Sequence, residues 1–215
     1  LLRKGTAMIT RWMLGDSHTV MNFGTTFFSE LLQIHPGWIE RFAQVGVAGS
    51  TLLDWTSAEK MQQHQVRWSH RTVDQQEDQA GVCPVTVTLD KVKKAKLLIL
   101  ELGTNDLRSI ESGLITFANY EKSLIQVFES FNVEKLVWIA PPLLSENVVS
   151  MKNQKHYHEL YLRACEFYHI QKIDSFKEGI QADHQDGYHM SAHHGASWGR
   201  WAAAKIFKES AGSPL

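Results

Sequence analysis

The 215-residue chain contains 22 lysines and arginines against 23 aspartates and glutamates, which is a formal net charge of -1. Nucleic-acid binding normally needs a basic surplus, so this balance argues against a nucleic-acid partner. A chain of this length forms one domain or at most two small ones, and one domain of this size folds without a disulfide or metal staple. The two cysteines, Cys83 and Cys165, show neither metal-ligand spacing nor a disulfide framework.

No apolar stretch approaches the length needed to cross a membrane, so we expect no integral membrane segment. The chain also lacks a signal-peptide pattern, but it opens with Leu1 rather than methionine. We therefore take it to be a trimmed or mature form. The missing leader then says little about the compartment in which the protein works.

The first half of the chain predicts two strands on either side of one helix. Residues 7–14 form a strand, residues 22–34 have the period of an amphipathic helix that ends at His35-Pro36-Gly37, and residues 38–47 form the second strand. The middle segment is less regular. It predicts a polar helix over 57–76, an exposed loop over 75–81 and a strand over 85–89.

The second half of the chain alternates more clearly between strands and helices. Strands are predicted over 96–102, 136–140 and 170–173, and helices over 113–131, 149–168 and 192–209. Strands that alternate with helices imply a parallel sheet covered on both faces. We therefore expect an α/β protein with no domain boundary inside residues 1–215.

Polar sequences follow the strands at 15–18, 46–51 and 103–106, and another, 186–189, lies in the loop before the last helix. Ligand sites of parallel sheets lie beyond the carboxyl ends of the strands, and right-handed connections bring all four segments to that edge. Ser17 stands at a strand–turn–helix junction, where the helix points free N–H groups at anionic oxygen. The sequence therefore predicts one site at this edge.

Three side chains in these segments can act as nucleophile, base and orienter. A serine hydroxyl is a weak nucleophile unless a positioned imidazole takes its proton. A carboxylate then fixes the imidazole tautomer and stabilises the imidazolium. Ser17, His189 and Asp186 can fill these roles. The alternative is a loop in which Asp186 and His189 only cap the last helix.

Acyl transfer also needs hydrogen-bond donors aimed at the developing oxyanion. Candidates are the backbone N–H groups of Ser17 and Gly49 and the side-chain amide of Asn105. Taken singly, Gly49 is an ordinary turn glycine and Asn105 an asparagine that holds a loop. Their joint placement at one edge favours the oxyanion role.

The four segments resemble, in order, the sequence blocks of the SGNH/GDSL hydrolase family. Gly15-Asp16-Ser17 resembles the first block, Val45-Gly46-Val47-Ala48-Gly49 the second, Gly103-Thr104-Asn105-Asp106 the third and Asp186-Gly187-Tyr188-His189 the last. The chain departs from the family at Met190, where proline is common, and in a segment 56–90 that is longer than in small members. The G-x-S-x-G elbow of the α/β-hydrolases is absent.

This resemblance implies a three-layer α/β/α sandwich with a central parallel sheet, the flavodoxin-like SGNH hydrolase fold, as a single domain. It implies a serine esterase that works through an acyl-enzyme and needs no cofactor or metal. Ser17, Asp186 and His189 would be catalytic, and Ser17, Gly49 and Asn105 would form the oxyanion hole. The oligomeric state is left open.

The sequence Gly-Asp-Ser-His-Thr is similar to the first block of peptidoglycan O-acetylesterases and other carbohydrate esterases of this family. The resemblance favours a glycan ester or a small-molecule ester as substrate, and O-deacetylation of a carbohydrate as the reaction. A glycan substrate would place the protein in the periplasm or outside the cell, and other esters in the cytoplasm. The candidates for substrate contact are Asp16, His18, Trp55 and Tyr188, with Trp198 as a further aromatic residue. Core packing is the alternative for the tryptophans.

Three other functions remain open. A lipase or thioesterase for longer acyl chains would need an apolar groove, built by residues 20–34 or 56–90. A non-catalytic carbohydrate-binding module would keep the fold without the reaction. A metal hydrolase would use the cluster of ligand-type side chains near the last helix, although the HExxH spacing is absent. That cluster comprises Asp183, His184, Asp186, His189, His193 and His194.

Overall fold

The computed structural model describes residues 8–56, 59–60, 67–80 and 92–210. Their strands form one sheet in the order β4-β3-β2-β1-β5-β6-β7. The strands are β1 (Arg11–Gly15), β2 (Phe42–Val47), β3 (Arg67–Arg71), β4 (Gln76–Ala80), β5 (Leu97–Glu101), β6 (Lys135–Ile139) and β7 (Gln171–Ile173). Strands β2, β1, β5, β6 and β7 are parallel, whereas β3 and β4 form an antiparallel hairpin at one edge.

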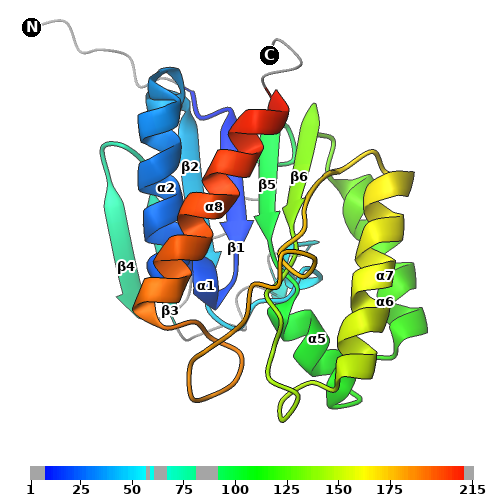
Figure 1. Ribbon diagram of the computed structural model, residues 1–215. Coiled ribbons are helices and arrows are strands. Elements are labelled where there is room, and N and C mark those ends of the chain that lie inside the picture. The colour runs from blue at the N-terminus through cyan, green and yellow to red at the C-terminus, as the bar shows by residue number, and fades with distance from the viewer. Residues whose placement is uncertain (1–7, 57–58, 61–66, 81–91, 211–215) are drawn as a thin grey trace, which may run out of the picture.

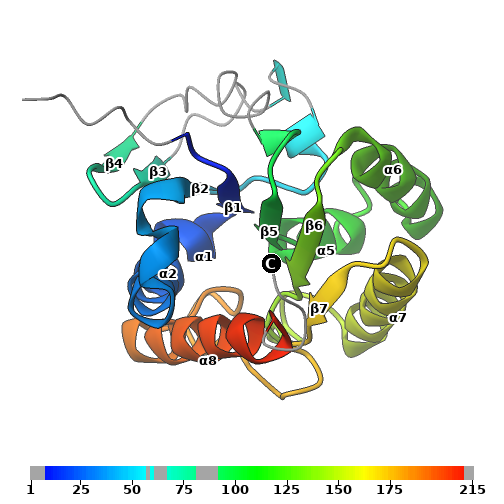
Figure 2. The ribbon, with the colours of Figure 1, turned by 90° about the horizontal axis from the view of Figure 1, so that it is seen from above.

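Helices cover both faces of this sheet (Figures 1 and 2). On one face, α2 (Asn22–Ile34) packs against α8 (Ala192–Ser210). The other face carries α5 (Thr104–Glu111), α6 (Phe117–Ser130) and α7 (Met151–Phe167). The single-turn helix α1 (Ser17–Val20) follows β1, and η1 (Pro36–Arg41) and η2 (Asp54–Thr56) are short 3-10 helices. The predicted α/β sheet, covered on both faces, is confirmed.

The central strand β5 shows why the strands are continuous apolar runs. Successive side chains of a strand point to opposite faces. Leu97 and Ile99 pack in the core beside α2 and α8, whereas Leu98 and Leu100 pack in the core beside α6 and α7. Because both faces are covered, no position on this strand is left for a solvated side chain.

The carboxyl ends of the parallel strands meet at one edge, as expected. The register pairs Gly15 at the end of β1 with Gly46 of β2 and Glu101 of β5. Helix α1 crosses so closely here that a Cβ atom at Gly15 would lie 1.8 Å from Oγ1 of Thr19. Glycine at position 15 is therefore a requirement of the close approach of α1 to the sheet.

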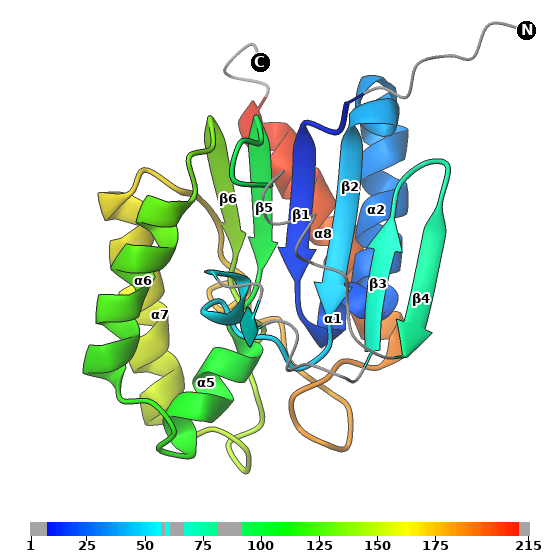
Figure 3. The same cartoon turned by 180° about the vertical axis from the view of Figure 1, so that it is seen from behind.

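In the middle of the chain, two predictions are wrong. Residues 67–71 and 76–80 form strands β3 and β4, beside β2 at the sheet edge (Figure 3), where we expected a polar helix and an exposed loop. The polar composition concealed the hairpin because Ser69 and Arg71 are buried through mutual hydrogen bonding rather than solvated. The strand predicted over 85–89 lies outside the described residues.

Two further boundaries differ from the prediction. The second strand begins at Phe42 rather than at Trp38, because η1 occupies the preceding residues. The helix predicted over 113–131 begins at Phe117, and α5, which precedes it, was not predicted. Helix α5 is only eight residues long and polar on average, which is too short for its periodicity to be recognised in a window of about 11–18 residues.

Candidate active site

The candidate nucleophile stands at the first turn of α1. Strand β1 ends at Gly15, and the carboxylate of Asp16 caps the helix by accepting the backbone N–H of His18 at 2.9 Å. The helix begins at Ser17, a residue that is 8% exposed. The cap thus holds a nearly buried hydroxyl at the carboxyl edge of the sheet.

The loop before α8 brings the other two side chains to Ser17. Oγ of Ser17 lies 2.8 Å from Nε2 of His189, and Nδ1 of His189 lies 2.7 Å from Oδ2 of Asp186. Oδ1 of Asp186 accepts the backbone N–H groups of Tyr188 and His189 at 3.1 and 2.9 Å. An ionised carboxylate only accepts hydrogen bonds, so it assigns the ring proton to Nδ1 and leaves Nε2 to accept from the serine hydroxyl.

The charge of Asp186 is held in place by its hydrogen bonds. Partial burial alone would raise the pKa of this carboxyl, but bonds from the His189 ring and from the backbone N–H groups of His189 and Tyr188 outweigh that effect. The pKa of Asp186 therefore lies below its usual range. A permanent carboxylate can balance the imidazolium that forms when His189 takes a proton. Nδ1 of the exposed His184 lies 3.1 Å from the same Oδ2 atom.

The candidate oxyanion donors lie on the two loops that follow β2 and β5. Gly49 has a positive φ of 81°, which the turn after β2 requires. Among the described residues, no acceptor takes a hydrogen bond from the backbone N–H of Ser17 or Gly49. Nδ2 of Asn105 donates to the Ser50 carbonyl at 3.0 Å and makes a longer contact of 3.4 Å with Oδ2 of Asp16.

An open cleft of about 540 Å³ lies beside these donors. The guanidinium of Arg108 lies over the ring of Tyr188, 4.1 Å from its centroid, and that ring lies 4.6 Å from the ring of His189. The cleft is large enough for a sugar-sized group and mixes polar with apolar side chains. Its lining residues are Gly49, Thr51, Asn105, Arg108, Ser109, Glu111, Ser112, Leu114 and Val148.

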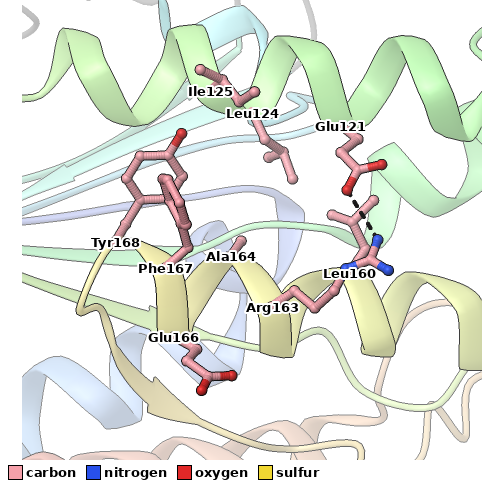
Figure 4. Close-up of a pocket in the computed structure, with 9 residues that line it drawn as sticks. All are labelled: Glu121, Leu124, Ile125, Leu160, Arg163, Ala164, Glu166, Phe167 and Tyr168. Carbon is pink, nitrogen blue, oxygen red and sulfur yellow. Dashed lines mark hydrogen bonds and ion pairs between the residues drawn. The ribbon is translucent and has the colours of Figure 1, made fainter.

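A second groove, of about 570 Å³, runs between α6 and α7 (Figure 4). It is more apolar than the cleft, and Arg163 pairs with Glu121 across it at 3.0 Å. Its lining residues are Glu121, Leu124, Ile125, Leu160, Arg163, Ala164, Glu166, Phe167 and Tyr168. None of them belongs to the loops around Ser17, so the cleft is the better candidate for a substrate site.

Buried ionisable groups surround the nucleophile. Burial, opposed by the N–H of His18 and assisted by the charge of Asp106, raises the pKa of Asp16 to about 7. Burial likewise raises the pKa of Asp106 to about 7 against the hydrogen bond from the Leu52 N–H. Burial lowers the pKa of His18 to about 3, so this imidazole is neutral at ordinary pH.

Burial corrects the expected set of substrate contacts. The side chain of Trp55 is 0% exposed, lies in the core and donates its Nε1–H to Oγ of Ser50. Trp198, 1% exposed, packs beside α2 in the same way. A tryptophan buries more apolar area in the core than it does when it lines an open cleft. Asp16 and His18 are also buried, so of the four expected contacts only Tyr188 is partly exposed, and its ring lies against Arg108, which lines the cleft.

The cluster of ligand-type side chains splits into two smaller groups, one around Asp183 and one around Asp186. Nδ1 of His194 pairs with Asp183, whereas His184 and His189 both turn to Asp186. Within the described ranges, no group of three or more such side chains is placed to hold a metal ion. No helix in the described part of the chain has the length and apolar character of a membrane span.

The sequence does not reveal the residues of β3 and β5 that bind α1. The buried guanidinium of Arg71 on β3 donates to the carbonyls of Thr19 and Val20, each at 3.0 Å. Oγ1 of Thr19 donates to the buried carboxyl of Glu101 at 2.8 Å. These residues lie in unremarkable polar and apolar stretches, and only the arrangement of β3 and β5 around α1 identifies them.

No protein-family model matches the sequence, and no curated protein matches it either. Solved structures match over nearly its whole length. The fold is similar to that of the lipase/acylhydrolase from Enterococcus faecalis, with a TM-score of 0.63 and 16% identity over 93% of this chain and 96% of that one. It is also similar to a catalytic mutant of an acetylxylan esterase from Geobacillus stearothermophilus, with a TM-score of 0.61 and 12% identity over 94% and 95% of the chains.

A carbohydrate acetylesterase from Sinorhizobium meliloti is similar with a TM-score of 0.52 and 17% identity, over 93% of this chain and 99% of that one. Together with the parallel sheet and its helices, these likenesses define the class: the chain has the fold of the SGNH hydrolases.

Proposed function

We propose that this protein is a serine esterase that hydrolyses ester bonds through an acyl-enzyme, with O-acetylated carbohydrates as its substrates. The single observation that carries this proposal is the hydrogen-bonded series from Ser17 to His189 to Asp186, at 2.8 and 2.7 Å. A serine hydroxyl is activated by such a base, and the base by such a carboxylate.

In the first half of the reaction, Oγ of Ser17 attacks the ester carbonyl carbon while its proton passes to Nε2 of His189. The oxyanion that forms is stabilised by the N–H groups of Ser17 and Gly49 and by the Asn105 amide. The imidazolium then returns the proton to the departing alcohol oxygen, and the acyl group stays on Ser17. Asp186 supports the transient positive charge on His189.

In the second half, water takes the place of the alcohol. Nε2 of His189 removes a proton from the water as the water oxygen attacks the acyl carbon. Collapse of the second oxyanion breaks the bond to Oγ of Ser17, which takes the proton back from the imidazolium. The products are the free acid and the enzyme in its starting state.

The choice of carbohydrate over long acyl chains is supported by the cleft beside Asn105. Six of its nine lining residues have polar side chains, and Leu114 and Val148 are the two large apolar residues among them. Two of the structurally similar proteins are acetyl esterases of carbohydrates. The similar lipase/acylhydrolase favours the second candidate, an esterase for longer acyl chains.

The test combines covalent labelling with turnover. A fluorophosphonate probe should label the wild-type protein, and 4-nitrophenyl acetate should be hydrolysed. Ser17→Ala should abolish labelling and reduce turnover by several orders of magnitude. Ser29→Ala, the same change at an exposed serine on α2, should alter neither. An unlabelled wild type, as a non-catalytic binding module would be, rejects the proposal.

The substrate is tested on a panel of acetylated glycans and 4-nitrophenyl esters of increasing acyl length. We expect kcat/KM to be highest for acetyl groups on glycans and to fall as the acyl chain lengthens. A rise with chain length would favour the lipase or thioesterase alternative.

A further inference from the structure

We propose that Arg108 forms a subsite for a carboxylate on the substrate, so that this protein prefers esters with a negative charge near the scissile bond. The inference rests on the proposed esterase function and adds the charge of the substrate to it. It is carried by the position of Arg108, by the way its guanidinium is held and by the charges around it.

Arg108 and the candidate oxyanion donor Asn105 belong to the same short helix, α5. Residues three apart on a helix lie on the same side of it, with their Cβ atoms about 5–6 Å apart. Both residues line the cleft, together with Gly49. A cation at position 108 therefore stands one helical turn away from the place where the ester carbonyl would lie.

The guanidinium of Arg108 is held by its flat face. It lies over the ring of Tyr188, the residue before His189, at 4.1 Å from the ring centroid. Stacking occupies a face of the guanidinium and leaves the N–H groups in its plane available. Within the described part of the chain, the contact with Tyr188 is the only one this guanidinium makes, so its N–H groups have no acceptor and no carboxylate pairs with it. A fork of free, oriented donors matches the two oxygens of a carboxylate.

The acidic residue in the lining, Glu111, is turned toward other donors. Its Oε2 accepts the backbone N–H and the hydroxyl of Ser150 at 3.1 and 3.0 Å, and Nδ2 of Asn153 at 2.7 Å. These donors belong to the N-terminus of α7, where a negative charge is stabilised. Glu111 is thus compensated from outside the cleft, and Arg108 is the cation that faces the substrate.

The carboxylate could belong to either side of the ester. An acetylated uronic acid would carry it on the alcohol, and the half-ester of a dicarboxylic acid would carry it on the acyl group. Two pairs of substrates separate these sources. One pair is an O-acetylated methyl glucuronoside and its neutral carboxamide; the other is the 4-nitrophenyl half-ester of glutaric acid and its neutral carboxamide.

We expect the wild type to hydrolyse the carboxylate member of one pair with the higher kcat/KM, and the preference to weaken as salt is added. Arg108→Gln should lower kcat/KM for that carboxylate ester on the order of 10-fold, since charge-assisted hydrogen bonds are lost, and change its neutral partner by no more than about 2-fold. Arg108→Lys should retain part of the preference. Arg163→Gln removes an exposed arginine from the groove between α6 and α7, and kcat/KM should stay the same for all four esters.

Equal kcat/KM values within both pairs in the wild type would overturn the proposal. So would an equal proportional loss for charged and neutral esters in Arg108→Gln, because Arg108 would then act only by supporting Tyr188. If the wild type hydrolyses none of the four esters, the esterase function itself fails. The neutral esters therefore distinguish the failure of this inference from the failure of the proposed function.

Discussion

The hydroxyl of Ser17 and Nε2 of His189 lie 2.8 Å apart although 172 positions separate the two residues in the sequence. The capped helix α1 positions Ser17 at the edge of the sheet, and Asp186 orients the ring of His189 in the loop before α8. Each partner is thus oriented by its own element before the two meet. Such preorganisation is what a proton transfer between them requires.

The orientation of His189 by Asp186 can be tested by a substitution that keeps the shape of the side chain. Asp186→Asn places an amide where the ring N–H donates and so favours the wrong tautomer. We expect kcat to fall on the order of 1,000-fold or more, with little change in KM. Steady-state kinetics on 4-nitrophenyl acetate measures this.

A matched control lies on the same loop. Asp183 accepts the backbone N–H of Ser191 and pairs with His194, away from Ser17. Asp183→Asn should leave kcat within about 3-fold of the wild type, because Asp183 makes no hydrogen bond to Ser17, His189 or Asp186. If it is as damaging as Asp186→Asn, the carboxylate that orients the base has been misassigned.

The oxyanion role of Asn105 predicts a loss confined to the transition state. Asn105→Ala should reduce kcat on the order of 100-fold while KM changes little. Because Nδ2 of Asn105 also donates to the Ser50 carbonyl, the melting temperature must be measured in parallel. Asn119→Ala, the same change at an exposed position on α6, is the control. A loss that appears only in KM would contradict the oxyanion role.

The buried guanidinium of Arg71 should support both stability and nucleophile position. It donates to the last carbonyls of α1, at Thr19 and Val20. Arg71→Met leaves those carbonyls without this donor and should lower the free energy of unfolding on the order of 3 kcal/mol. Arg71→Lys should recover part of this loss, since an ammonium cannot reach both carbonyls with the geometry of the fork.

The two effects of Arg71 can be separated by measuring denaturation and labelling in the same samples. At a temperature where each variant is folded, Arg71→Met should still react more slowly with the fluorophosphonate probe than wild type. An unchanged labelling rate in the folded variant would restrict Arg71 to a purely structural role.

The raised pKa of Asp106 predicts a pH dependence of stability. The value in the folded protein, about 7, is higher than the ordinary 3.8, so the folded protein binds this proton more tightly than the unfolded chain does. The contribution of Asp106 to stability is therefore fully present below about pH 4 and is lost as the pH rises through about 7. Asp106→Asn should remove this contribution while keeping an acceptor for the Leu52 N–H.

Urea unfolding of both proteins at about pH 5 and about pH 8 measures the difference, which should be a few kcal/mol smaller in the variant than in the wild type. An identical pH dependence in the two proteins would mean that Asp106 is ionised in the folded state across this range.

The parallel sheet could be predicted from the sequence because its strands are buried on both faces. Runs such as 97–100 have no solvated position, and the helices that flank them carry one apolar face. The hairpin of β3 and β4 could not be predicted in this way. Arg71 is charged in sequence and buried in the structure, and a pattern of polarity does not reveal a buried residue whose partners, here on α1 and β2, lie elsewhere in the chain.

The candidate triad could be predicted from the sequence for a related reason. Ser17, Asp186 and His189 follow or precede elements whose ends the sequence already indicates, and a parallel sheet gathers those ends at one edge. The residues that would contact the substrate could not be predicted from the sequence. Trp55 and Tyr188 are both aromatic residues near site segments, yet Trp55 is fully buried whereas Tyr188 is partly exposed and stacks with Arg108.

The sequence by itself determined the alternation of the parallel strands with the helices that cover them, the edge at which polar segments collect and the side chains that are candidates to act there. These follow from local periodicity and chain direction, which act over neighbouring residues. Only the tertiary structure decided that Arg71 holds α1, that Trp55 is core and that Arg108 stacks on Tyr188 beside the cleft. Those relationships join residues distant in sequence, and the packing and hydrogen bonding of the folded chain set which of them meet.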